Sequence, residues 1–137
     1  MGAGFSKPKN PIPGTDMAGV VDSVGRDVRQ FQPGDAVYGD IYSSGLGAFA
    51  EYVAASETSF VLKSEGTSFE EAAAVPVAGL TALQCLRDQG RIQAGQKVLI
   101  NGASGGVGTF AVQIAKAFGA EVTGVCSTHN LEMVRSI

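Results

Sequence analysis

A glycine-rich loop between a short apolar run and an amphipathic run constrains the fold of this chain more than any other feature. Residues 97–100 predict a short buried strand, residues 102–108 form the glycine loop, and the apolar spacing over residues 109–118 predicts a helix. Residues 121–125 predict a second strand. A strand, a helix and a strand with a crossover of this length predict a right-handed βαβ unit in a parallel sheet.

The loop fits a dinucleotide-binding fingerprint in which Ala103, Gly105 and Gly108 hold the three glycine positions, with alanine at the first. These positions require a small residue in a tight turn, close approach of a pyrophosphate to the backbone, and close packing of the helix. The free amides and the positive end of the following helix attract phosphate. We therefore expect the loop to bind a dinucleotide through Ala103, Ser104, Gly105, Gly106, Val107 and Gly108. A purely structural glycine turn is the alternative.

The same residues also satisfy G-x-S-x-G, the nucleophile elbow of α/β-hydrolases, over positions 102–106. Ser104 would then be the nucleophile, and an acid and a histidine would have to follow it. The one histidine of the chain, His129, lies just beyond the next predicted strand. Because the elbow leaves Gly108 unexplained, a hydrolase is the less favoured interpretation.

The residues after the second predicted strand bear on the choice of nucleotide. An acidic residue that binds the adenosine ribose is expected about 20 residues past the glycine motif. Residues 126–130 contain no carboxylate, and Ser127, Thr128 and His129 leave space and hydrogen-bond donors for a 2′-phosphate. NADPH is therefore expected in preference to NADH, with an ordinary polar loop as the alternative.

The first half of the chain predicts short strands and tight turns. Residues 18–24 are apolar and β-branched, residues 36–38 follow a Pro-Gly-Asp turn, and residues 48–53 alternate in polarity. Three short strands separated by glycine or proline residues predict part of a small β-rich domain.

Helices are expected between the strand-rich part and the glycine loop. Ser68 and Glu71 form a capping box that opens a helix, which breaks at Pro76. A second helix is expected over residues 78–89, with Gly90 as its left-handed stop. We expect one domain over residues 1–76 and a second over residues 77–137. The last helix, from residue 131, has no C-terminal cap, so the chain is expected to be cut there.

Composition excludes several classes of function. The formal charge of −3 gives no broad positive field, so a nucleic-acid partner is not expected. No apolar window approaches the roughly 18 residues of a membrane span. Cys85 and Cys126 indicate reduced thiols in a cytosol-like compartment, hence a cytoplasmic location. Gly2 and Ser6 satisfy a short N-myristoylation pattern, which is often met by chance.

Motifs along the whole chain resemble those of the medium-chain dehydrogenase/reductase superfamily, specifically its zinc-free quinone oxidoreductase (zeta-crystallin-like) branch. They occur in family order: residues 13–21, Val24-Gly25, Phe31, Pro33-Gly34-Asp35, residues 47–52, Ala72-Ala73-Ala74, Gly79-Leu80-Thr81-Ala82 and the glycine loop. The resemblance implies an α/β fold: part of a β-rich GroES-like catalytic domain, followed by the first βαβ unit of a Rossmann parallel sheet. Because family members are longer at both ends, it implies an internal fragment.

The resemblance also implies roles for individual residues. Thr15 stands where zinc-dependent members carry a metal-binding histidine, and the cysteines of the structural-zinc lobe are missing, so no metal is expected. Thr81 matches the threonine beside the nicotinamide ring, although it could simply bond back to its own helix turn. Tyr42 is a candidate residue of the substrate cleft. Other catalytic residues stay unknown, because the branch supplies its active-site Asn and Asp from the missing N-terminal part.

The function implied is NADPH-dependent hydride transfer to a quinone, an enone or a related carbonyl acceptor without zinc. The partner would be that small molecule, and the full-length form would be a homo-oligomer. The alternative, from another class, is a catalytically inactive truncated fragment that only binds dinucleotide.

Overall fold

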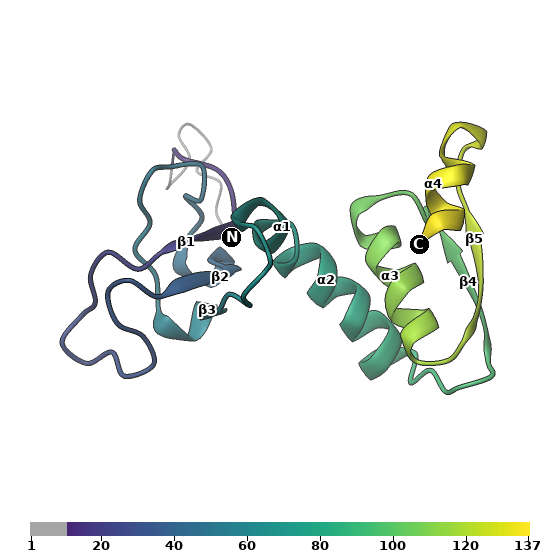
Figure 1. The fold of residues 1–137 in the computed structure, drawn as a ribbon, viewed down its shortest axis with the longest axis horizontal. Coiled ribbons are helices and arrows are strands. Elements are labelled where there is room, and N and C mark those ends of the chain that lie inside the picture. The colour runs from purple at the N-terminus through teal and green to yellow at the C-terminus, as the bar shows by residue number, and fades with distance from the viewer. Residues whose placement is uncertain (1–10) are drawn as a thin grey trace, which may run out of the picture. The chain divides into compact units, whose positions relative to one another are not determined.

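A computed structural model describes residues 11–137, which form two compact units (Figure 1). The first unit ends at Val77 and the second covers Ala78–Ile137. The expected division into domains after residue 76 stays a prediction. The acylation pattern at Gly2 lies outside the described residues. Within the described part of the chain, no helix has the length and apolar character that a membrane span needs.

The first unit holds a three-stranded antiparallel sheet in the order β1-β2-β3. Its strands are β1 (Asp16–Val20), β2 (Ala36–Asp40) and β3 (Phe60–Leu62). Gly34 makes the turn before β2 with a φ of +97°, and its N–H donates to the Val21 carbonyl at 2.8 Å. The strand-rich part expected from the sequence is therefore present.

The strand expected over residues 48–53 is wrong. The N–H of Phe49 donates to the Pro13 carbonyl at 3.0 Å, and no described residue pairs with the rest of the segment as a strand. Phe49 and Tyr52 are 75% and 76% exposed. Alternating polarity gave the segment a strand pattern, but a strand also needs a neighbour for its backbone hydrogen bonds. Here β3 takes the place beside β2.

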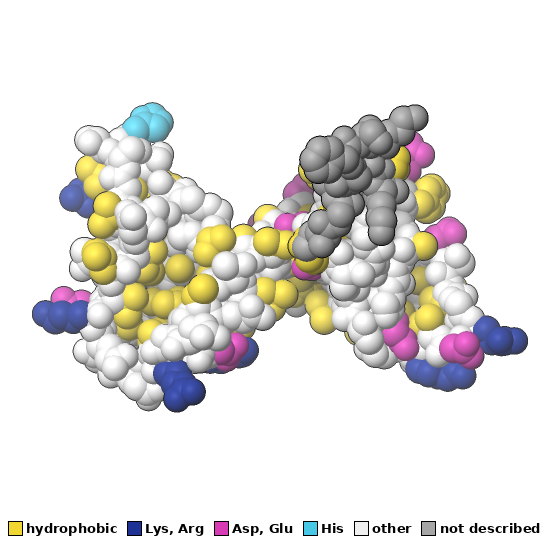
Figure 2. Space-filling view, turned by 180° about the vertical axis from the view of Figure 1, so that it is seen from behind, with side chains coloured by type: hydrophobic (Ala, Val, Ile, Leu, Met, Phe, Trp, Pro, Cys, Tyr) yellow, Lys and Arg dark blue, Asp and Glu magenta, His cyan; other side chains and the backbone are white. Residues whose placement is uncertain are grey.

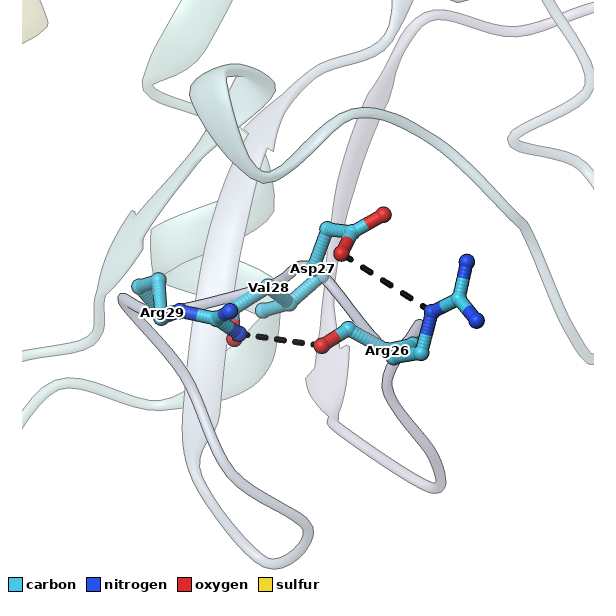
Figure 3. Close-up of polar contacts among 4 residues, drawn as sticks. All are labelled: Arg26, Asp27, Val28 and Arg29. Atoms are coloured by element: carbon cyan, nitrogen blue, oxygen red, sulfur yellow. Dashed lines mark hydrogen bonds and ion pairs between the residues drawn. The ribbon is translucent and has the colours of Figure 1, made fainter.

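The loop between β1 and β2 closes on itself and on the start of the third strand. The Arg29 guanidinium donates to the carbonyls of Arg26 at 2.9 Å and Val28 at 3.0 Å (Figure 3). The backbone N–H groups of Arg29 and Gln30 donate to Glu57 Oε2 at 3.0 and 2.9 Å. These two bonds hold the pKa of the Glu57 carboxyl below its ordinary value, and the bond from Arg29 has the larger effect. Glu57 therefore joins this loop to the short helix η2 (Glu57–Ser59) that precedes β3.

The predicted capping box opens α1 (Phe69–Ala73). The Glu71 N–H donates to Ser68 Oγ at 3.1 Å, and the Ser68 N–H donates to Glu71 Oε2 at 2.8 Å. The next helix, α2 (Pro76–Leu83), starts at Pro76, whose missing N–H costs nothing at a first helical position. Asp16 Oδ1, from β1, accepts the Val77 N–H at 2.8 Å and so caps α2.

The helical run ends at Gln89, as expected, but the left-handed stop expected at Gly90 is wrong. After α2 the chain continues as a π-helical segment, η3 (Gln84–Gln89), and the Gly90 N–H donates to the Cys85 carbonyl at 2.8 Å. Gly90 has a φ of −76°, and the left-handed residue is Arg91, with a φ of +47°. A β-carbon at Gly90 would lie 3.0 Å from the Cys85 oxygen. Glycine at this position therefore permits a close backbone approach and not a left-handed stop.

The second unit contains the predicted βαβ arrangement. The strands β4 (Lys97–Asn101) and β5 (Glu121–Val125) are parallel, with Lys97 opposite Glu121 and Asn101 opposite Val125. The helix α3 (Gly106–Ala117) crosses between them and contacts both (Figure 1). The short helices η4 (Thr128–Asn130) and α4 (Leu131–Ser136) follow. This confirms the α/β fold class.

A single buried cluster holds the second unit together. The side chains of Ala111, Val112 and Ala115 on α3 pack with Ile100 of β4 and with Ala103 of the glycine loop. Ala82, Leu86 and Ile92 complete the cluster. Gly119 ends α3 in the left-handed conformation, with a φ of +78°, as its position in the sequence predicts. The glycine loop is therefore anchored in the core of its unit.

Candidate functional site

The glycine loop is tied to the end of β5 at its very start. The N–H groups of Gly102 and Ala103 both donate to the Val125 carbonyl at 2.9 Å. The Gly105 N–H donates back to the Gly102 carbonyl at 2.9 Å and closes the turn. Gly102, with a φ of +76°, supplies the left-handed residue, whereas Ala103 is completely buried. The tight turn therefore depends on Gly102, and Ala103 fills the core beneath it.

The later glycines of the loop differ in the space around them. A β-carbon at Gly108 would overlap the Gly102 carbonyl oxygen and lie 2.9 Å from Ala103 Cα. One at Gly105 would lie 3.3 Å from the Gly102 oxygen, and one at Gly106 would meet nothing within 4 Å. Gly108 is buried, while Gly105, Gly106 and Val107 are exposed. The loop thus has a packed side against α3 and an open glycine edge.

The open edge coincides with the start of α3. Gly105 stands at the N-cap position without a side chain, and its carbonyl accepts the Thr109 N–H at 2.9 Å. The amides of Gly106, Val107 and Gly108 precede that first helical bond, so the helix itself supplies no acceptor for them. Together with the positive end of the helix dipole, they form a site suited to an anion such as a pyrophosphate.

The loop after β5, residues 126–130, contacts the glycine loop through Asn130. Its Nδ2 donates to Ser104 Oγ at 3.1 Å and to Ser127 Oγ at 3.1 Å, and its backbone N–H donates to the Ser127 carbonyl at 3.0 Å. Ser104 belongs to the predicted pyrophosphate loop and Ser127 to the predicted ribose loop. The structure therefore brings these two predicted site residues to one side chain. Asn130 itself was not predicted from the sequence, since only the missing carboxylate drew attention to residues 126–130.

The other predicted residues of the ribose loop are exposed. Thr128 and His129 lie in η4, and the chain's one histidine, drawn in cyan, stands out at the surface in Figure 2. In the described part of the chain, no hydrogen bond joins His129 to Ser104. Ser104 is also absent from the described non-glycine residues with positive φ, which are Leu46 and Arg91. The strained, base-activated serine that a hydrolase elbow requires is therefore not observed here.

Thr81 and Tyr42 lie apart from these two loops in the chain. Thr81 is exposed on α2, and its neighbour Ala82 belongs to the same buried cluster as Ala103. Among residues 11–137 the Thr81 hydroxyl makes no hydrogen bond to its own helix turn. Tyr42 belongs to the first unit, where it opens the short helix η1 (Tyr42–Ser44) directly after β2. Its N–H donates to Asp40 Oδ1 at 2.8 Å, and the residue is 46% exposed.

Thr15, the residue at the zinc-ligand place, lies just before β1 and is half-buried. Its carbonyl accepts the Ile41 N–H at 2.9 Å. Nowhere in residues 11–137 do three His, Cys, Asp or Glu side chains gather as a metal site would require. Zinc independence stays a prediction.

Comparisons with known proteins agree with this architecture. Residues 2–65 match the family model of the alcohol dehydrogenase GroES-like domain. A chloroplast envelope quinone oxidoreductase homolog of Arabidopsis thaliana is 44% identical over 131 residues, which are 92% of this chain and 40% of that protein. A mitochondrial NAD(P)H oxidoreductase of Mus musculus is 41% identical over 128 residues, 90% of this chain and 32% of that protein.

A solved structure extends the similarity to three dimensions. The quinone oxidoreductase of Coxiella burnetii superposes with a TM-score of 0.86 and 38% sequence identity, over 93% of this chain and 41% of that one. The chain thus spans well under half the length of each of these relatives. The match covers both the antiparallel sheet and the βαβ unit, so the chain is similar over more than nine-tenths of its length to part of these quinone oxidoreductases.

Proposed function

We propose that the protein is an NADPH-dependent oxidoreductase of the zinc-free quinone oxidoreductase type. It transfers hydride to a quinone, an enone or a related carbonyl acceptor. The observation that carries the proposal is the contact of Asn130 with both Ser104 and Ser127, because it joins the predicted phosphate-binding loop to the predicted ribose-binding loop. Relatives named quinone oxidoreductase and NAD(P)H oxidoreductase support the reaction class.

The residues of the second unit fit a dinucleotide. The open edge at Gly105 and Gly106 has no side chain to exclude a pyrophosphate, and the amides at the start of α3 have no acceptor within the helix and can donate to an anion. When bound, the nicotinamide ring supplies the hydride chemistry. The protein's part is to bind the phosphates at the glycine loop and to orient the ring, for which Thr81 is the proposed contact.

NADPH is favoured over NADH by the chemistry of the second loop. Residues 126–130 carry no carboxylate that would repel a 2′-phosphate. Ser127, Thr128 and His129 are exposed and can donate hydrogen bonds to it. Phosphate oxygens accept such bonds, so the loop suits a phosphorylated ribose.

The acceptor class follows from the missing metal ligand. A threonine at position 15 is a poor substitute for the histidine that binds zinc in other members of the superfamily. Without a metal to polarise a carbonyl, the acceptor must itself be electron-poor at the carbon or oxygen that takes the hydride, as quinones and enones are. Tyr42 is the proposed residue of the acceptor cleft, either as a proton donor or as part of its wall. We place the protein in the cytoplasm as a homo-oligomer, with domains at residues 1–76 and 77–137.

The proposal is tested with the complete polypeptide that contains residues 1–137. NADPH oxidation is followed by nicotinamide absorbance in the presence of a quinone, and separately of an enone. We expect turnover with NADPH that exceeds turnover with NADH and is unchanged by a metal chelator. Stoichiometric zinc whose removal stops the reaction would refute the zinc-free type. NADPH binding without any turnover would favour the alternative of a non-catalytic dinucleotide-binding protein.

A further inference from the structure

The side chain of Asn130 does not cap the helix that follows it. It stands at the N-cap of α4, where asparagine commonly accepts a backbone N–H of the first turn through its side chain. No such cap bond forms at Asn130. Its amide reaches instead to Ser104, 26 positions earlier, and to Ser127, three positions earlier. The side chain therefore serves the two loops and not its own helix.

The chemistry of this contact sets the direction of two hydroxyl groups. A side-chain amide nitrogen carries two N–H donors, and here one goes to each serine. A hydroxyl has one donor and two acceptor lone pairs. Because Ser104 Oγ and Ser127 Oγ each accept from Asn130, each keeps its own proton for another acceptor. Accepting one bond also strengthens the bond that a hydroxyl donates.

We propose that Asn130 is a positioning residue for the nucleotide, an inference that rests on the proposed function. Its amide holds Ser104 and Ser127 as hydrogen-bond donors, Ser104 toward the pyrophosphate and Ser127 toward the 2′-phosphate of NADPH. Phosphate oxygens accept hydrogen bonds at neutral pH, so a serine that had donated its proton within the protein could not bind them in this way. Asn130 thereby contributes to the preference for NADPH without touching the nucleotide.

The test compares nucleotide affinities of the complete polypeptide and its variants by fluorescence titration. In Asn130→Ala the serines lose their orienting donor, and we expect NADPH affinity to fall about 5- to 30-fold, as for the loss of one or two net hydrogen bonds. NADH affinity falls less, because NADH has no phosphate for Ser127. Gln113→Ala is the matched control: it removes an exposed amide bonded to the Thr109 carbonyl at 3.1 Å, and both affinities should stay unchanged.

A double-variant cycle separates positioning from folding. Once Ser127→Ala has removed the hydroxyl, adding Asn130→Ala should weaken NADPH binding by a smaller factor than it does alone. The more conservative Asn130→Asp keeps the side-chain shape but can only accept, so it draws in the serine protons and repels the 2′-phosphate. It should weaken NADPH binding at least as much as Asn130→Ala. In steady state, KM for NADPH should rise with little change in kcat.

The outcomes distinguish this inference from the function on which it rests. Wild-type protein that binds NADPH, with equal losses of NADPH and NADH affinity in Asn130→Ala, would overturn the positioning role and leave the function standing. The same holds if the effects of Asn130→Ala and Ser127→Ala simply multiply, or if Asn130→Ala binds NADPH like wild type. Wild-type protein that binds neither nucleotide would overturn both.

Discussion

Gly108, in the first turn of α3, lies so close to the carbonyl oxygen of Gly102 that a β-carbon at position 108 would overlap it. This contact holds the start of the helix against the turn that precedes it. The third glycine of the fingerprint is thus required by packing within the protein, whereas the edge at Gly106 is open.

The first prediction is that Gly108→Ala destabilises the fold. The added methyl group must push α3 away from the turn at Gly102, and such overpacking costs about 1–3 kcal/mol. Gly106→Ala is the control, because a β-carbon there meets nothing within 4 Å. Urea unfolding of both variants measures the difference. Equal stabilities would show that the Gly108 contact does not constrain the loop.

Asp16 provides a second prediction, in the first unit. Its Oδ1 caps α2 by accepting the Val77 N–H at 2.8 Å, so Asp16→Ala should lower the free energy of unfolding by about 0.5–2 kcal/mol. Asp16→Asn keeps an acceptor oxygen and should recover part of the loss. Asp22→Ala, at an exposed position after β1, is the control. If Asp16→Ala were as stable as Asp22→Ala, the cap would contribute nothing.

Glu57 links stability to pH. The N–H groups of Arg29 and Gln30 lower the pKa of its carboxyl in the folded protein, so the folded state favours the ionised form. Its contribution to stability is fully present above the pKa of an unfolded glutamate, about 4.3, and is lost as the pH falls through the lower folded-state pKa. Glu57→Gln should therefore be less stable than wild type at neutral pH, with the gap closing in acid.

Urea midpoints for wild type and Glu57→Gln, measured from neutral pH to well below the ordinary glutamate pKa, test this directly. Glu51→Gln, at an exposed position, serves as the control and should follow the wild-type curve. A gap between Glu57→Gln and wild type that stays constant down to low pH would mean that ionisation of Glu57 does not contribute.

Ser127 provides a prediction about cofactor choice. Ser127→Asp keeps an acceptor for the Asn130 amide but places a negative charge where the 2′-phosphate is proposed to bind. NADPH affinity should fall about tenfold or more, which corresponds to ~1.4 kcal/mol, and NADH affinity should change less. Ser136→Asp adds the same charge at the far end of α4 and is the control. A loss of the same size for both nucleotides would argue against a phosphate at Ser127.

Local patterns predicted the second unit well because its elements are specified by neighbouring residues. The apolar run before the loop, the glycines within it and Gly119 after α3 each act within a few positions, and β4, α3 and β5 form as expected. Residues 48–53 show the opposite case, since their alternation is compatible with a strand but cannot supply a partner. Likewise, no sequence pattern around Gly90 predicts that α2 continues into a π-helical segment.

The candidate site likewise has features that the sequence predicted and one contact that it did not. The glycine loop and the polar residues after β5 could be found from motif spacing, because the fingerprint is local. The contact of Asn130 with Ser104 could not, because it joins residues 26 positions apart and depends on how β4 and β5 pair.

The central claim is that the glycine loop binds the nucleotide, and NADPH titration of Gly105→Val beside wild type tests it most directly. A side chain at position 105 excludes the pyrophosphate from the backbone, so NADPH binding should be lost. Thermal melting must accompany the titration, because a β-carbon there also lies 3.3 Å from the Gly102 oxygen. Ser104→Ala should weaken binding only by the worth of one hydrogen bond, about 0.5 to 3 kcal/mol. A folded Gly105→Val protein that binds NADPH like wild type, together with an esterase activity that Ser104→Ala destroys, would contradict the account.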